Sequence, residues 1–132
     1  MSSARPRQPE RGWNDKFRDA FRGIWLVARG QLSFRVHAAF VVAVVAGAAL
    51  LRMNVIQWCV LVLCMTSVLV AETFNTALEW LAKAVDRREN RRLGGALDMA
   101  GGAVLISACG AAVVGTVVFV SRLGVLLGWW TP

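Results

Sequence analysis

The sequence has few charged residues for its length. Of its 132 residues only 17% are Asp, Glu, Lys or Arg, whereas 57% are hydrophobic. Soluble globular domains carry about 25% charged residues. This composition therefore argues against a soluble domain and indicates a membrane protein whose length is that of a single domain.

The sequence also lacks the common motifs of nucleotide and metal sites. It contains neither a G-x-x-x-x-G-K-[ST] nor a G-x-G-x-x-G phosphate loop, so any nucleotide site must be built in another way. Its three cysteines lie inside apolar runs, show no disulfide or metal-binding spacing, and are interpreted as small hydrophobic residues. No soluble module that could hold a duplex is visible, so no nucleic-acid partner is expected.

Three long runs carry no charge, and these are Ala38–Leu51, Val55–Ala71 and Met99–Ser121. A helix needs roughly 20 residues to cross a hydrocarbon core of about 30 Å, so the third run qualifies alone and the first two qualify with their flanks. The runs are continuously apolar, whereas strands of a membrane barrel alternate. The sequence predicts an all-α membrane protein with spans over residues 34–52, 55–83 and 96–122.

The chain before the first span has a different pattern. Residues 1–10 have no apolar core, which predicts a disordered tail and not a cleavable signal peptide. From Trp13, apolar residues recur at helical spacing through Phe17, Phe21 and Ile24, so we expect an amphipathic helix over residues 12–29 that lies in the membrane interface. A soluble helix packed on a partner protein is the alternative. Residues 11–132 are expected to form one domain.

Basic residues indicate how the chain crosses the membrane. Seven precede the first span and four lie between the second and third, whereas only Arg52 lies between the first and second and only Arg122 follows the third. The positive-inside rule therefore predicts a cytoplasmic N-terminus and an external C-terminus. The net charge of +7 lies mostly on the cytoplasmic faces and fits anionic lipid headgroups.

The second span ends in "AETFNTALEW", Ala71–Trp80, where polar residues interrupt an apolar sequence. On a helix, six polar side chains fall within an arc of roughly 100°. They are Glu72, Asn75, Thr76, Glu79, Lys83 and Asp86. Counted from the outer end of the span, Glu72 comes after about 24 Å, near the inner edge of the hydrocarbon, and Glu79 lies about 10 Å further on.

Carboxylates at these two depths fit phosphoryl transfer to a lipid. Glu72 would lie where the hydroxyl of a lipid headgroup resides and could accept its proton as a general base. Glu79, nearer to water, could bind the Mg²⁺ that accompanies nucleotide phosphates. Asn75 could orient either reactant, although an amide in a span more often only joins helices. Two carboxylates on one face favour a functional site, since such groups are costly inside a membrane.

These residues resemble a known family. "ETFNTALE", Glu72–Glu79, is similar to the E-x-x-N-[ST]-x-x-E signature of the prokaryotic integral-membrane diacylglycerol kinase and undecaprenol kinase family. "FRDAFRGI", Phe17–Ile24, and "SFRVH" resemble the family's amphipathic helix and its entry into the first span. "ALDMAGGAVLI", Ala96–Ile106, resembles the start of its third span. The resemblance covers about residues 17–114 and implies a homotrimeric kinase of the bacterial cytoplasmic membrane that uses ATP and Mg²⁺ on a lipid alcohol.

The resemblance also implies a role for each matching position. The catalytic residues would be Glu72 and Asn75, and the metal ligands would be Glu79 and Gln31. Asp98 would be an acid of the nucleotide site. A direct transfer from ATP docked at the cytoplasmic surface would add Arg88, Glu89 and Asn90, and Lys83 is a further candidate for the phosphates. The lipid would meet Phe21, Arg35 and His37. Contact between copies would use small residues of the first and third spans, which are Ala39, Ala43, Gly47, Ala100, Gly101, Ala108 and Gly115.

Three positions depart from the family pattern. Gln31 stands where the family usually has Glu, Lys83 where it has Asp, and Leu97 where it has Lys before Asp98. One hypothesis is that Lys83 replaces the lost lysine at the phosphates. Another is a weakened or inactive member that acts as a membrane interaction protein.

A third hypothesis is a proton-coupled transporter protomer in which Glu72 binds the cation, but such proteins usually have four spans. For a kinase, undecaprenol and diacylglycerol both stay open as acceptors. The similarity of the amphipathic helix to the undecaprenol kinase branch favours undecaprenol.

Overall fold

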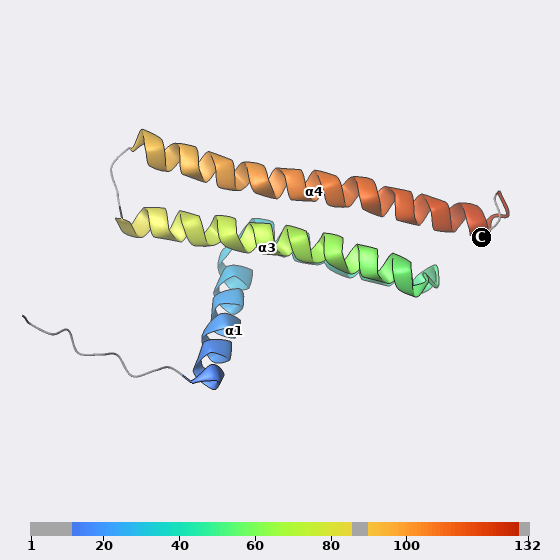
Figure 1. The fold of residues 1–132 in the computed structure, drawn as a ribbon, viewed down its shortest axis with the longest axis horizontal. Helices are drawn as coiled ribbons and strands as arrows, with labels where there is room; N and C mark the ends of the chain where they lie inside the picture. Colours follow the sequence, from blue (N-terminus) through green and yellow to red (C-terminus); the bar gives the residue numbers. More distant parts are fainter. Residues whose placement is uncertain (1–11, 86–89, 130–132) are drawn as a thin grey trace, which may run out of the picture.

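The computed structural model describes residues 12–85 and 90–129, and this part of the chain consists of four α-helices without a strand (Figure 1). They are α1 (Trp13–Gly30), α2 (Leu32–Leu50), α3 (Val55–Val85) and α4 (Arg91–Leu126). The predicted all-α class is therefore confirmed. The tail predicted over residues 1–10 lies outside the described residues.

Helices α2, α3 and α4 are each long and apolar enough to cross a membrane, which confirms the three predicted spans. In Figure 1, α3 and α4 run side by side and antiparallel, and α2 lies largely behind α3. The 31 residues of α3 extend about 46 Å, which exceeds the hydrocarbon thickness of about 30 Å. One helix can thus carry polar residues from membrane depth into the water.

Helix α1 runs across the direction of α3 and α4 (Figure 1). Gln31 alone separates it from α2, and the extended backbone of that residue (φ −119°, ψ 122°) breaks the helical path. The apolar side chains of Trp13, Phe17 and Phe21 are exposed, while Val27 near the end of the helix is buried. An amphipathic helix set across the spans suits the predicted position in the membrane interface.

Helix α4 begins at Arg91 and not near residue 96, the predicted start of its span. Asn90 is the reason, because its side-chain oxygen accepts hydrogen bonds from the backbone N–H groups of Arg92 (3.0 Å) and Leu93 (3.4 Å). Such a cap satisfies amide groups that the first turn of a helix leaves without partners. The two arginines therefore belong to the first turn of the helix and not to a loop.

A cluster of buried apolar side chains lies at the far end of the bundle from α1. Ala48, Met53 and Leu61 are buried there as one apolar cluster. Arg122 of α4 donates hydrogen bonds to the carbonyl oxygens of Leu51 (2.9 Å) and Arg52 (2.8 Å), which join α2 to α3. We call this end the clasped end.

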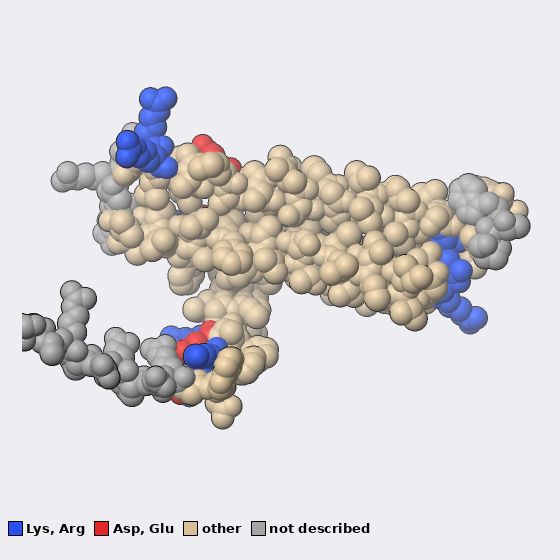
Figure 2. Space-filling model, in the orientation of Figure 1, with Lys and Arg blue, Asp and Glu red and all other residues tan. Residues whose placement is uncertain are grey.

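Charged residues are distributed along the bundle as a membrane requires. On the face shown in Figure 2, Lys and Arg side chains lie on α1 and at the two ends of the bundle. The surface between those ends shows none. Because ionised groups are costly in hydrocarbon, this uncharged band marks the part of the bundle that lipid can surround.

Candidate active site

Two polar clusters lie on the seam between α2 and α3, at the end of the bundle where α1 joins. We call this end the polar end. The first cluster contains Glu72, whose side chain is only 2% exposed. Its carboxylate accepts a hydrogen bond from the hydroxyl of Ser33 on α2. A buried carboxylate needs such a partner, because an uncompensated polar group is costly away from water.

The second cluster surrounds Glu79, two turns further along α3 and half-buried. Its Oε2 atom accepts a hydrogen bond from Nε2 of Gln31 (3.2 Å), and its Oε1 atom accepts one from Nδ2 of Asn75 (3.0 Å). Asn75 lies one turn before Glu79 on the same helix face. The structure thus brings Gln31, Asn75 and Glu79 together.

Both carboxylates are contacted by the joint between α1 and α2. Gln31, which contacts Glu79, is the residue between the two helices, and Ser33, which contacts Glu72, is the second residue of α2. The seven residues between the carboxylates correspond to a rise of about 10 Å along α3. One carboxylate is therefore enclosed in the seam while the other reaches a more open position.

The oxygen atoms around Glu79 are of the kind that Mg²⁺ prefers. They comprise its carboxylate and, once the two amide groups turn, the side-chain oxygens of Gln31 and Asn75, which in the structure direct their nitrogens at that carboxylate. Among the described residues no group of three His, Cys, Asp or Glu side chains could hold a metal ion. This donor set fits a magnesium ion that shares its ligands with nucleotide phosphates and water better than an ion caged by protein alone.

The residues predicted to bind the nucleotide are more scattered. Lys83 and Asp98 are exposed, on α3 and α4 respectively. Asn90 uses its side-chain oxygen to cap α4. Arg88 and Glu89 lie outside the described residues, as does Asp86, the last of the six polar residues predicted to share one helix face. In the described part of the chain, the structure therefore shows no nucleotide cluster comparable to the one around Glu79.

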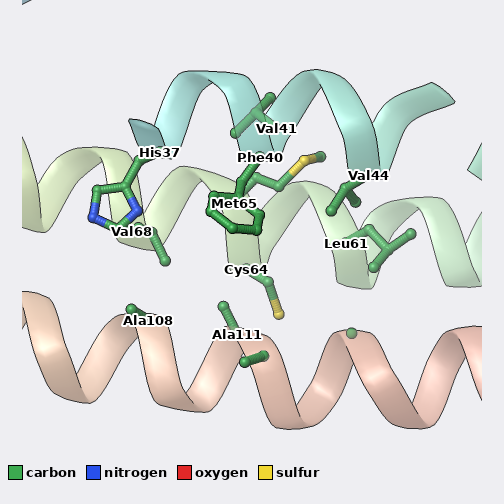
Figure 3. A pocket seen from close by; sticks show the side chains of 12 residues that line it. His37, Phe40, Val41, Val44, Leu61, Cys64, Met65, Val68, Ala108 and Ala111 are labelled. Carbon is green, nitrogen blue, oxygen red and sulfur yellow. The ribbon is translucent and has the colours of Figure 1, made fainter. Parts of the chain in front are cut away.

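The residues predicted to meet the lipid are also on different surfaces. Phe21 on α1 and Arg35 on α2 are exposed. His37 lines a pocket of about 270 Å³ between α2, α3 and α4 (Figure 3).

Neither this pocket nor the contact of Ser33 with Glu72 was predicted from the sequence. The only signal for Ser33 was its place in "SFRVH", the segment similar to the family's entry into the first span.

The sequence is similar to known lipid kinases. The family model described as prokaryotic diacylglycerol kinase matches residues 18–119. The chain is 31% identical over 107 residues to an undecaprenol kinase of Bacillus subtilis (strain 168), a match that covers 81% of this chain and 87% of that protein. It is 37% identical over 100 residues to a diacylglycerol kinase of a Synechocystis species, covering 75% of this chain and 57% of that protein. No solved structure shows a significant match.

The family match extends from within α1 to within α4, and the matches support the lipid kinase among the three functions that the sequence left open. Together with three helices able to cross a membrane, they make the chain a multi-pass membrane protein. The chain belongs to the prokaryotic diacylglycerol kinase family and is a lipid kinase.

Proposed function

We propose that this kinase transfers the γ-phosphoryl group of ATP to the hydroxyl group of undecaprenol or diacylglycerol, with Glu72 as the general base. The observation that carries the proposal is the enclosed carboxylate of Glu72, which has a hydrogen-bond donor in Ser33 and lies on the same helix face as Glu79. A lipid hydroxyl reaches such a position from the bilayer, and a nucleotide reaches Glu79 from water. The two reactants meet along α3.

The proposed reaction is a direct in-line transfer. Glu72 accepts the proton of the lipid hydroxyl while the hydroxyl oxygen bonds to the γ-phosphorus. The bond between the γ-phosphorus and its bridging oxygen breaks, and ADP leaves with the bonding electron pair. Ser33 keeps the carboxylate of Glu72 oriented through its hydrogen bond. No covalent enzyme intermediate is needed.

Glu79, Gln31 and Asn75 are the residues proposed to hold Mg²⁺. The bound ion would neutralise negative charge on the phosphates as the transfer proceeds. Since Gln31 replaces a glutamate that the family usually has, the site carries one negative charge less. In the structure the amide group of Gln31 donates a hydrogen bond to Glu79, which an ionised glutamate at this position could not do.

The remaining nucleotide contacts belong to the same proposal. Lys83 lies one turn beyond Glu79 on the same face of α3 and is exposed, so a phosphate group can reach its side chain from the water. It would take the place of the lysine that the family has at Leu97. Arg88, Glu89, Asn90 and Asp98 are the other proposed contacts.

The setting in the cell is also proposed. The distribution of Lys and Arg supports a bacterial cytoplasmic membrane protein with its N-terminus in the cytoplasm and its C-terminus outside. Anionic headgroups would meet the basic side chains of α1. The homotrimer is proposed from the family resemblance.

The decisive experiment measures the transfer of labelled γ-phosphate from ATP, with Mg²⁺, into undecaprenol and diacylglycerol offered in parallel to the purified protein. Glu72→Gln is the matched control because it keeps the shape of the side chain and an oxygen for Ser33. We expect the wild type to phosphorylate at least one lipid and the variant to be slower by about 10²- to 10⁴-fold, the usual contribution of a general base. Full turnover by a folded Glu72→Gln protein would contradict the role of this residue.

A further inference from the structure

Two arginines come together at the clasped end of the bundle. Arg122 of α4 donates a hydrogen bond from Nε to the carbonyl oxygen of Leu51 (2.9 Å) and one from Nη2 to that of Arg52 (2.8 Å). Arg52 is exposed, and its side chain makes no hydrogen bond or ion pair within the part of the chain that the structure describes. One small region of the surface therefore carries two positive charges.

The backbone between α2 and α3 fixes the position of Arg52. Its N–H group donates to the carbonyl oxygen of Ala49 (3.1 Å), and the next N–H group, that of Met53, donates to Ala48 (3.1 Å). In this tight turn Arg52 has a φ of 49°, a left-handed conformation in which glycine or asparagine is usual. An arginine kept in a conformation that costs energy points to a role for its side chain.

Arg122 retains hydrogen-bonding capacity after it has bound the two carbonyl groups. A guanidinium group has five N–H donors, and the remaining ones lie on Nη1 and Nη2. Because its present bonds already fix its position, the group can bind a ligand with little further loss of conformational entropy. The planar edge of a guanidinium group matches two oxygen atoms of a phosphate group.

No acidic side chain lies near these charges. The sequence has no Asp or Glu between Asp19 and Glu72, and none after Asp98. Glu72 lies about 26 Å along α3 from its first residue, and Asp98 lies about 36 Å along α4 from Arg122. On the face shown in Figure 2, the clasped end carries Lys or Arg side chains and no Asp or Glu. The ligand that complements this end is an anion.

The depth of the two arginines in the membrane indicates the source of that anion. Helix α2 has 19 residues and rises about 28 Å, close to the hydrocarbon thickness of about 30 Å. Arg52, just beyond its end, therefore lies among lipid headgroups in whichever direction the chain crosses the membrane. The neighbouring side chains of Leu50, Val55 and Ile56 are exposed and offer an apolar surface to acyl chains. A phosphate group that belongs to a lipid fits this setting better than a free phosphate ion.

The charge of the site favours one class of phospholipid. A zwitterionic headgroup carries an ammonium group beside its phosphate, and the clasped end has no Asp or Glu side chain to pair with that cation. The headgroup of phosphatidylglycerol carries the phosphate without a cation. Two basic side chains should therefore attract phosphatidylglycerol more strongly than phosphatidylethanolamine.

We infer that Arg52 and Arg122 bind the phosphate group of an anionic phospholipid at the clasped end. The bound phosphate bridges α4 and the connection between α2 and α3. This contact lies at the opposite end of the bundle from Glu72 and Glu79, and it differs from the contact proposed between headgroups and α1. It does not depend on the proposed reaction.

The first test is photolabelling of the full-length protein in phosphatidylcholine vesicles. The probe is phosphatidylglycerol with a diazirine next to its phosphate group. We expect labels near Leu50 and Val55 that excess phosphatidylglycerol suppresses and excess phosphatidylethanolamine does not. At a low probe concentration, Arg52→Gln should reduce these labels about fivefold, the usual contribution of one basic side chain at a membrane surface. Labels on α1 should stay unchanged.

The second test measures thermal unfolding in a neutral detergent with and without phosphatidylglycerol. The lipid should raise the melting temperature of the wild type, because a ligand that binds only the folded state stabilises it. The rise should be smaller in Arg52→Gln and in Arg122→Gln, each compared with its own value without lipid. Arg91→Gln removes an exposed arginine at the other end of α4 and should keep the wild-type rise.

Three results would overturn the inference. The first is suppression of the labels by phosphatidylethanolamine as effectively as by phosphatidylglycerol. The second is suppression by millimolar inorganic phosphate, since the ligand would then be a free ion and not a lipid. The third is an equal loss of the lipid-dependent rise in Arg52→Gln and Arg91→Gln, which would mean that the lipid responds only to the total charge of the protein.

Discussion

The two ends of the α2–α3 pair are built from different interactions. At the polar end, Glu72 and Glu79 are contacted by side-chain hydrogen bonds from the α1–α2 joint. At the clasped end, buried apolar side chains pack together and Arg122 joins α4 to the connection between α2 and α3. A hydrogen bond to a charged group contributes about 1.5–3 kcal/mol, and burying one large apolar side chain contributes a similar amount, so the clasped end, which combines both kinds of interaction, should have the larger total.

This difference suggests that one end of the helix pair mainly stabilises the fold while the other end binds the substrates. Stability should depend mainly on the clasped end, which leaves the polar side chains free to exchange their present partners for substrates. Variants at the polar end should then lower the rate with little effect on unfolding. Variants at the clasped end should do the reverse.

After Glu72→Gln, the largest effect is expected at Glu79. In Glu79→Gln the proposed metal site loses its only carboxylate, and the loss of charge stabilisation in the transition state should slow phosphoryl transfer about 10²-fold. The melting temperature in detergent should change by less than about 2 °C. The measurements are kcat over a Mg²⁺ titration and thermal unfolding. Gln57→Ala, a polar change near the clasped end, serves as the control and should keep the wild-type kcat.

Gly47→Leu tests the clasped end, where a Cβ atom at this position would lie 2.9 Å from Cε1 of Phe119. Overpacking of this kind costs about 2 kcal/mol of unfolding free energy. Gly110→Leu is the matched control, because its side chain meets open space. Both variants should keep the wild-type kcat while folded. A double variant with Phe119→Ala should recover part of the loss, and no recovery would show that the clash is not its cause.

How far the sequence predicted this structure depends on the range of each interaction. The three spans and the polar stripe follow from patterns within one helix, so they could be read from hydropathy and from 100° periodicity. The interaction of Ser33 with Glu72 joins residues 39 apart, and that of Arg122 with Leu51 joins residues 71 apart. Such pairs depend on how helices pack, and no local pattern determines that packing.

Asn90 shows a local interaction that was not predicted. Its assignment to the nucleotide stays a prediction, and in the structure its side chain caps α4. The cap is a local interaction, and an asparagine before a helix is a recognised signal. The adjacent arginines were interpreted only as basic residues between the second and third spans.

The next effect concerns Arg122. Arg122→Leu removes two charge-assisted hydrogen bonds at the clasped end and should lower the unfolding free energy by about 1 kcal/mol, because the half-exposed carbonyl groups can turn to water instead. Arg122→Lys should lower the unfolding free energy by a smaller amount, since an ammonium group can replace only part of the two hydrogen bonds that the planar guanidinium group makes. Unfolding in detergent measures both. A fall in kcat equal to that of Glu79→Gln would mean that the two ends are coupled.

Ser33→Ala should give the smallest effect. It tests whether a hydrogen bond at the polar end serves the reaction or the stability of the fold. If the hydroxyl of Ser33 positions Glu72, its loss should lower kcat about threefold, because the base keeps its place on α3 and loses one hydrogen bond that orients it, with the KM for both substrates unchanged. Ser33→Thr keeps a hydroxyl group and should restore the rate. A lower melting temperature with an unchanged kcat would instead make the contact structural. In that case the carboxylate of Glu72 would help to hold α2 against α3, and the polar end would serve stability as the clasped end does.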